Sequence, residues 1–249
     1  MVSAGTPPEA GAAARRLSAP PIRDAATLIL LRDVATRPRV LMGQRGTAAA
    51  FMPDKFVFPG GALDAQDAQV SLAVGMGAPC ARRLRQAPRP ESPAPEPDAL
   101  AAAAIRELWE EAGLILGMPG RWSGPVPPGW RSFAATGHRP SAAGMRFVFR
   151  AITPPGRSRR FDARFFLADA SMLAGDPDDF SRATDELSHL QWIPLADARN
   201  FDLPFITEVV LAEVAARLPD LSPPETVPFF NNSDERSLFE RLGGRSPLG

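Results

Sequence analysis

Three glutamates at helical spacing are the residues in this sequence best suited to chemistry. Glu107, Glu110 and Glu111 lie three and four positions apart, so on a helix their carboxylates project from about one face. Like charges at this spacing cost stability, and the single guanidinium of Arg106, four residues before Glu110, cannot neutralise all three. Oxygen ligands of this kind suit a hard divalent cation such as Mg²⁺ or Mn²⁺. The alternative is a solvated acidic helix face that holds no ligand.

The element that must position these carboxylates is a helix over residues 99–112. Its alanine- and leucine-rich composition favours a helix because these side chains lose little entropy there. Asp98 is the predicted N-cap, preceded by Pro97, and Gly113 is placed to end the helix.

A glycine-rich turn some forty residues upstream is the second positioning element. The short strand 56–58 runs into Pro59, Gly60 and Gly61. Glycines without a Cβ let the main chain approach a ligand closely. Taken alone, the three residues predict only a turn.

These two elements together resemble the Nudix box G-x5-E-x7-R-E-U-x-E-E-x-G-U, in which U is a bulky aliphatic residue. Gly61 and Asp67 match its start, and residues 106–114 match its second half at every fixed position. Asp67 stands where the box has Glu, and the spacer runs from Ala68 to Ile105 instead of over seven residues. Split boxes of this kind are typical of the Nudix branch that contains the peroxisomal coenzyme A diphosphatases and bacterial relatives. Further segments that resemble this branch are 51–61, 152–155, 160–166 and 203–207.

The resemblance implies an α/β fold, the Nudix α/β/α sandwich with a mixed central sheet, a loop insertion inside the box and a C-terminal helix. We expect a flexible tail over 1–20, a Nudix domain over 21–218 and a C-terminal extension over 219–249. Within the domain, the insertion is 68–98: a short helix is expected in its first half and an extended, mobile, proline-rich second half. A substrate lid, a partner surface and an inert loop are all compatible with it.

Local patterns predict the other elements. A buried strand is expected at 24–32 and further strands at 39–45, 145–152 and 161–167. Asp202 is expected to cap a final helix that has Pro204 at its start. Arg160 and Arg164 are expected on the outside of their strand. Trp122 and Trp130 could stack on a purine, although packing in the core is the commoner use of tryptophan. Phe229 and Phe230 predict packing on the domain or across a homodimer.

The resemblance also implies the activity, that of a metal-dependent hydrolase of a diphosphate linkage in a nucleoside diphosphate derivative. The branch implies coenzyme A or acyl-coenzyme A as the small-molecule substrate. The implied ligands of Mg²⁺ or Mn²⁺ are Glu107, Glu110, Glu111 and the main chain at Gly61.

The catalytic candidates are Glu110 and Glu186 for proton transfer and Arg106 for holding the acidic helix. His189 is an alternative base. Arg45 and Arg160 are the candidate substrate-binding residues. A nucleotide-binding or regulatory module with little catalysis is the alternative function.

Composition excludes several partners. The chain of 249 residues carries 28 basic and 28 acidic side chains, so no basic field favours nucleic acid or an anionic membrane. No apolar run approaches the ~20 residues that a membrane span needs. The single cysteine, Cys80, excludes an internal disulfide, and with the absence of a signal sequence in the first residues it predicts a cytoplasmic location. The abundance of arginine, alanine and proline indicates a bacterial source.

Overall fold

A mixed β-sheet organises the part of the chain that the computed structural model describes, which is residues 20–47, 49, 51–234 and 238–244. Within those residues the sheet has nine strands, in the order β11-β10-β7-β8-β1-β2-β3, with β4 paired to β1 and β9 paired to β2. The strands are β1 (Ile22–Arg32), β2 (Arg39–Arg45), β3 (Phe56–Val57), β4 (Gly60–Ala62), β7 (Arg146–Ile152), β8 (Arg160–Asp169), β9 (Leu187–Pro194), β10 (Val227–Asn231) and β11 (Leu238–Leu242). A separate ribbon pairs β5 (Gly117–Pro119) with β6 (His138–Pro140).

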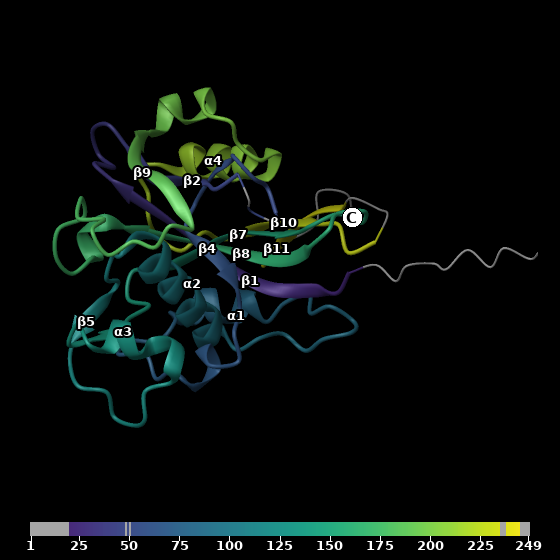
Figure 1. Ribbon diagram of the computed structural model, residues 1–249. Coiled ribbons are helices and arrows are strands. Elements are labelled where there is room, and N and C mark those ends of the chain that lie inside the picture. The colour runs from purple at the N-terminus through teal and green to yellow at the C-terminus, as the bar shows by residue number, and fades with distance from the viewer. Residues whose placement is uncertain (1–19, 48, 50, 235–237, 245–249) are drawn as a thin grey trace, which may run out of the picture.

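Helices cover both faces of this sheet. They are α1 (Ala78–Leu84), α2 (Pro97–Ala112), α3 (Arg131–Ala134) and α4 (Phe205–Arg217), with short 3₁₀ turns η1 (Asp67–Gln69), η2 (Pro128–Trp130), η3 (Ala170–Met172) and η4 (Leu195–Asn200). Figure 1 shows α1 and α2 below the strands and α4 above them. This confirms the predicted α/β/α sandwich with a mixed sheet and a C-terminal helix.

Strand β1 lies at the centre of the sandwich and divides its two cores. Leu28 and Leu30 pack with α2, whereas Ile29 and Leu31 pack with α4. The strand is parallel to β8 and antiparallel to β2 and β4. Its apolar run is therefore buried on both faces, as expected for a central strand.

The helix α2 forms as its sequence predicts, but its first turn is built differently. Pro97 is the first helical residue, and within the described structure the side chain of the N-cap residue Glu96 makes no capping hydrogen bond. Asp98 instead accepts a hydrogen bond from the main-chain N–H of Met76 at 2.8 Å. At the other end Gly113 takes the left-handed conformation, with φ of 71°, which glycine adopts without strain. The predicted N-cap at Asp98 is therefore wrong, and the predicted end at Gly113 is confirmed.

The final helix shows the same kind of difference. It begins at Phe205 after Pro204, again without a side-chain cap. Asp202 is instead paired with Lys55. Both aspartates thus bind the segment that folds against the helix start, a use that local sequence does not reveal.

The proline-rich half of the insertion is anchored to the sheet, contrary to the expected mobile loop. The side chain of Arg89 is 6% exposed and pairs with Asp24 at 3.0 Å and with Asp162 at 3.2 Å. Arg150 contacts Asp162 at 2.7 Å and donates to the carbonyl of Ala87 at 2.9 Å. Charged groups buried in this way must be paired, so the contacts fix the loop.

The same buried layer corrects the expected exposure of two arginines on β8. Arg160 and Arg164 are 6% and 2% exposed, and Arg164 pairs with Asp24 and with the fully buried Asp162. Arg164 shares both aspartates with Arg89 of the insertion, whereas Arg160 is buried against the carbonyls of Thr153, Asn232 and Ser233.

Residues of the expected C-terminal extension add strands to the sheet. Strand β10 pairs in parallel with β7, and β11 completes a hairpin with β10. Phe229 is buried under the guanidinium of Arg150, while Phe230 contacts Phe205 and Phe239. The two phenylalanines were predicted to pack either on the domain or across a homodimer, and in the structure they pack on the domain. The expected tail at 1–20 lies outside the described residues except for Pro20.

Candidate active site

The guanidinium of Arg106 joins the two halves of the split box. Its Nε and Nη2 donate to the carboxylate of Asp67 at 2.9 and 3.0 Å. Its Nη1 donates to Glu107 and to Glu110, each at 2.9 Å, and Nη2 also reaches the carbonyl of Ala62 at 3.0 Å. One side chain therefore fixes the box loop against the acidic helix.

Asp67 reaches this guanidinium even though it is one methylene shorter than the usual Glu. It is fully buried at the start of η1. Besides Arg106, it accepts the main-chain N–H of Asp64 at 2.9 Å and the indole N–H of Trp130 at 3.2 Å. The departure at position 67 thus leaves the link to Arg106 intact.

Glu111 is held by the glycine turn. Its Oε2 accepts the main-chain N–H of Gly60 at 2.8 Å, and the side chain is 1% exposed. Its Oε1 is buried and has no hydrogen-bond partner among the residues that the structure describes. A buried carboxylate oxygen left unpaired is costly, which indicates a position for a ligand.

Gly61 provides the space in which Glu107 lies. A Cβ on Gly61 would come within 2.5 Å of Glu107 Cδ and 2.7 Å of Glu107 Oε2. Real contacts of a Cβ are almost never this close, so a side chain at this position would displace the carboxylate.

Burial raises the pKa of all three glutamates. It raises the pKa of Glu107 to about 7, with Arg106 opposing the shift and Glu110 adding to it. Burial likewise raises the pKa of Glu110, and raises that of Glu111 well above its usual value. One guanidinium does not offset this much negative charge out of water.

These residues fit a hard divalent cation by their chemistry. Glu107 Oε2, Glu110 Oε1 and Glu111 Oε1 accept no hydrogen bond from any described residue. Carboxylate oxygens are the ligands that Mg²⁺ and Mn²⁺ prefer. In the described part of the chain, however, no three acidic, histidine or cysteine side chains are already arranged around one metal position. The carboxylate oxygens that could bind a metal are therefore present, but in this structure they do not yet surround a single position.

Arg45, at the end of β2, and Glu186, just before the start of β9, lie together at this site. The pairing of β2 with β9 sets Arg45 opposite Leu187, the residue after Glu186. Arg45 Nη2 lies 3.2 Å from Glu186 Oε1. Both charges act on Glu111, since Glu186 raises its pKa and Arg45 lowers it.

The loop that delivers Glu186 is docked on the end of α2. The main-chain N–H of Thr184 donates to the carbonyl of Glu110 at 3.0 Å. A Cβ on Gly113 would come within 2.9 Å of Ala183 N and of Arg182 Cβ. Gly113 therefore ends the helix and also admits this loop. His189, the alternative base, is exposed and contacts Ser188 Oγ.

The structure does not bring Arg160 to the carboxylates. Arg160 donates to the carbonyls of Thr153, Asn232 and Ser233. Its position on the sheet is opposite Ile22, whereas Gly60 is opposite Thr27. Five residues along a strand are about 16 Å, so a role in substrate binding requires a ligand that reaches this far.

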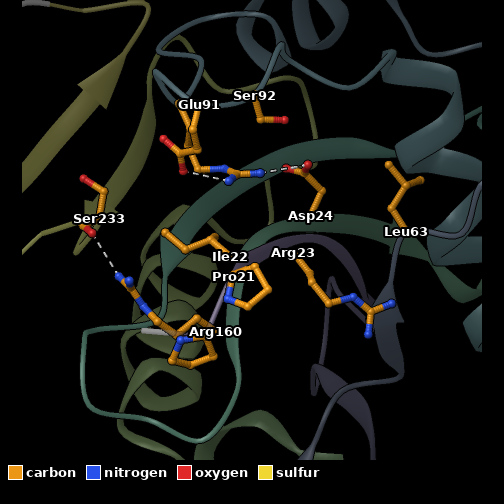
Figure 2. Close-up of a pocket in the computed structure, with 11 residues that line it drawn as sticks. Pro21, Ile22, Arg23, Asp24, Leu63, Glu91, Ser92, Arg160 and Ser233 are labelled. Carbon is orange, nitrogen blue, oxygen red and sulfur yellow. Dashed lines mark hydrogen bonds and ion pairs between the residues drawn. The ribbon is translucent and has the colours of Figure 1, made fainter. Parts of the chain in front are cut away.

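Arg160 instead lines a separate cavity of about 660 Å³ at the start of β1 (Figure 2). Arg89, Glu91 and Ser92 of the insertion and Ser233, which follows β10, also line it. In this cavity Arg89 pairs with Asp24 and Glu91, while Arg23 and Arg160 extend in different directions (Figure 2). The charged side chains that line this cavity therefore do not point toward one common position.

Sequence reasoning missed one residue next to the box. Trp130 is fully buried and contacts Trp122 and Phe133 by its ring. The expectation of core packing is therefore confirmed for Trp130, but its hydrogen bond to Asp67 was not foreseen. No local pattern signals a contact between residues 63 positions apart.

Comparison with known proteins decides the family. No family model matches the sequence. Nudix hydrolase 7 of Caenorhabditis elegans is 31% identical over 182 residues, which are 69% of this chain and 51% of that protein. The crystal structure of a Nudix hydrolase from Alicyclobacillus acidocaldarius aligns with a TM-score of 0.56 and 28% identity, over 80% of this chain and 93% of that one. The chain belongs to the Nudix hydrolase family.

A second Nudix relative carries a more specific name. Acyl-coenzyme A diphosphatase NUDT19 of Gallus gallus is 28% identical over 203 residues, which are 61% of this chain and 53% of that protein. The chain thus spans about half the length of each of these two curated relatives. Among the residues with described structure, no helix is both long and apolar enough to span a membrane.

Proposed function

We propose that this protein is a metal-dependent hydrolase that cleaves the diphosphate linkage of a nucleoside diphosphate derivative. The observation that carries the proposal is the set of free carboxylate oxygens on Glu107, Glu110 and Glu111 beside Gly61. Membership of the Nudix family supports the same reaction.

In this proposal the protein's own residues hold and orient the reacting groups. Mg²⁺ or Mn²⁺ held by the three glutamates and by the main chain at Gly61 would neutralise diphosphate oxygens and lower the pKa of the attacking water. Arg106 holds Glu107 and Glu110 in place. The N–H of Gly60 holds one oxygen of Glu111 and leaves the other free.

Proton transfer is assigned to a group of carboxylates. Glu186, held by Arg45, and Glu110 are the two candidates to accept the proton of the attacking water. Glu186 raises the pKa of each of the three box glutamates, so the proton acceptor is not assigned to one residue. Arg45 is the candidate contact for the charge of the substrate.

Coenzyme A or acyl-coenzyme A is the substrate that we propose. The split box and the similarity to the Gallus gallus acyl-coenzyme A diphosphatase support it. A module that binds a nucleotide without cleaving it is the second candidate. It has less support, because a sensor does not require three neighbouring carboxylates that each keep a free oxygen.

Location and assembly belong to the same proposal. A bacterial cytoplasm fits the single reduced Cys80 and the composition. A homodimer stays a prediction, and the packing of Phe229 and Phe230 within the chain removes one reason to expect it.

The proposal is tested by a product-resolved panel with Mg²⁺ or Mn²⁺. The substrates are coenzyme A, acyl-coenzyme A, ADP-ribose, NADH, dinucleotides and nucleoside triphosphates. Release of 3′,5′-ADP and phosphopantetheine from coenzyme A supports both reaction and substrate. Cleavage of a different diphosphate keeps the reaction and refutes the substrate. Binding without cleavage favours the sensor.

Two variants and a chelator complete this test. Glu111→Gln should reduce kcat at least a hundredfold in a folded protein, and EDTA should abolish turnover. The matched control is Glu208→Gln, which changes an exposed glutamate on α4. Nearly normal activity of Glu111→Gln would refute the mechanism.

A further inference from the structure

A hydrogen-bonded chain connects a buried tryptophan to the proposed metal-binding carboxylates. It begins at the indole N–H of Trp130, which donates to Asp67 Oδ1 at 3.2 Å. Asp67 in turn accepts a hydrogen bond from Arg106 on each of its two carboxylate oxygens. The remaining terminal nitrogen of Arg106 is shared by Glu107 and Glu110.

In this series of hydrogen bonds, the position of each group determines the position of the next. Nε and Nη2 of Arg106 form one edge of the guanidinium, and Asp67 occupies that edge. Because the guanidinium is rigid and planar, the orientation of the Asp67 carboxylate determines where Nη1 points. Nη1 then determines which oxygens of Glu107 and Glu110 are occupied and which stay free.

Trp130 is well placed to orient Asp67. It is 0% exposed and is packed against Trp122 and Phe133, with ring centroids 6.0 and 5.5 Å away. A second bond ties its segment to the box loop, since the N–H of Gly129 donates to Gln66 Oε1 at 2.9 Å. A donor held in a packed core loses little entropy when it forms its bond.

We propose that Trp130 is a positioning residue for the diphosphatase reaction, acting through Asp67 and Arg106 on Glu107 and Glu110. The inference rests on the proposed function for its kinetic consequence only. The hydrogen-bonded chain itself is testable without turnover.

Two substitutions at position 130 distinguish the effect of the hydrogen-bond donor N–H from the effect of side-chain size. Trp130→Phe keeps a large aromatic ring and removes the N–H. Trp130→His loses the six-membered ring but keeps a ring N–H, because imidazole Nε2 overlays the indole Nε1 when the five-membered rings superpose. The chain thus predicts that the His variant, although less well packed, performs better than the Phe variant.

Trp122→Phe is the matched control. It removes the same atoms from the same aromatic cluster, but the indole of Trp122 donates to the carbonyl of His138 at 2.9 Å and not to Asp67. Its effect on the melting temperature measures what packing in this cluster contributes.

The kinetic measurement is kcat and KM for the diphosphate substrate at saturating Mg²⁺. We expect Trp130→Phe to lower kcat about tenfold with less than a twofold change in KM. Trp130→His should recover at least half of that loss on a logarithmic scale, and Trp122→Phe, which leaves the indole bond to Asp67 in place, should lower kcat less than Trp130→Phe does. Equal losses in the Phe and His variants, or no loss in the Phe variant, would overturn the inference.

A spectroscopic measurement tests the chain independently of turnover. In protein with ¹⁵N-labelled arginine, the Nε–H signal of Arg106 is assigned by its disappearance in Arg106→Lys. We expect the signal to shift or exchange faster in Trp130→Phe and to stay in place in Trp122→Phe. If the wild type cleaves no diphosphate, the proposed function fails while this signal still decides the inference. An unmoved Arg106 signal in Trp130→Phe would refute it.

Discussion

Gly61→Ala is the substitution whose effect follows most directly from the geometry of the site. The added methyl group would lie 2.5 Å from Glu107 Cδ, where an ordinary contact needs 3.4 Å or more. The φ angle of Gly61 is not in the left-handed region, so alanine adds no backbone strain. The carboxylate, at the end of a flexible side chain, is the group that must move.

The required displacement sets the size of the effect. Glu107 must retreat by the difference between these distances, about 0.9 Å, and it lies between Gly61 and Arg106. A misplacement of about 1 Å in a catalytic arrangement costs on the order of a hundredfold in rate. This corresponds to about 2.7 kcal/mol in activation free energy. Stability should change by less than about 1 kcal/mol, because alanine restricts the unfolded chain more than glycine does.

The assay is kcat for diphosphate cleavage at saturating Mg²⁺, together with thermal unfolding by circular dichroism. Two glycines serve as controls. A Cβ on Gly124 would meet no atom of the described residues within 4 Å, so Gly124→Ala should be neutral. A Cβ on Gly60 would instead meet the main chain of Ala26 and Thr27 at 2.7 Å, so Gly60→Ala should destabilise the fold. If Gly61→Ala keeps more than a third of the wild-type kcat, the inferred place of Glu107 in the site is wrong.

Three further predictions concern charge. Burial raises the pKa of Glu107 from 4.5 to about 7, so the folded protein binds this proton more tightly than the unfolded chain does. The resulting stabilisation of the folded state is fully present below pH 4.5 and is lost as the pH rises through 7. The metal-free protein should therefore melt at a lower temperature at pH 8 than at pH 5, and a Glu107→Gln variant with the same slope would contradict this assignment. Arg89→Ala should lower the free energy of unfolding in urea by about 3 to 5 kcal/mol, because it leaves Asp24 and Asp162 with one buried partner fewer. The control is Arg85→Ala, which removes an exposed ion pair with Glu96 that contributes at most about 1 kcal/mol. Equal losses of unfolding free energy in the two variants would show that the insertion is not anchored by charge. Arg45→Ala should raise KM for the diphosphate more than it lowers kcat, with nearly unchanged melting, and an unaltered KM would remove Arg45 from the substrate site.

Several features of the site follow from local sequence. The spacing of Glu107, Glu110 and Glu111 places them on one helix face, and the contact of Arg106 with Glu110 is the i,i+4 pair that this spacing predicts. Gly113 ends the helix as its position indicates. These features depend on helical periodicity alone, so the sequence is sufficient to predict them.

Contacts between distant segments were predicted less well. The family resemblance pointed to Arg45 and Glu186 separately, but their pairing across 141 residues depends on the register of β2 with β9. The indole bond from Trp130 to Asp67 depends on how a loop folds over the box.

Burial of charge is where sequence reasoning was wrong. Arg160 and Arg164 were expected outside because arginine is rarely buried, and the proline-rich half of the insertion was expected to be mobile because prolines predict extended chain. In the structure, Asp162 gathers Arg89, Arg150 and Arg164 beneath the insertion.

The sequence by itself thus determined the family, the acidic helix and the glycine turn that faces it, because each is encoded in a short pattern of spacing and residue type. Only the tertiary structure decided which carboxylate oxygens stay free, which arginines are buried and which tryptophan reaches the box. The physical reason is that hydrogen bonding and burial depend on which segments meet, and that is set by sheet register and packing across the whole chain.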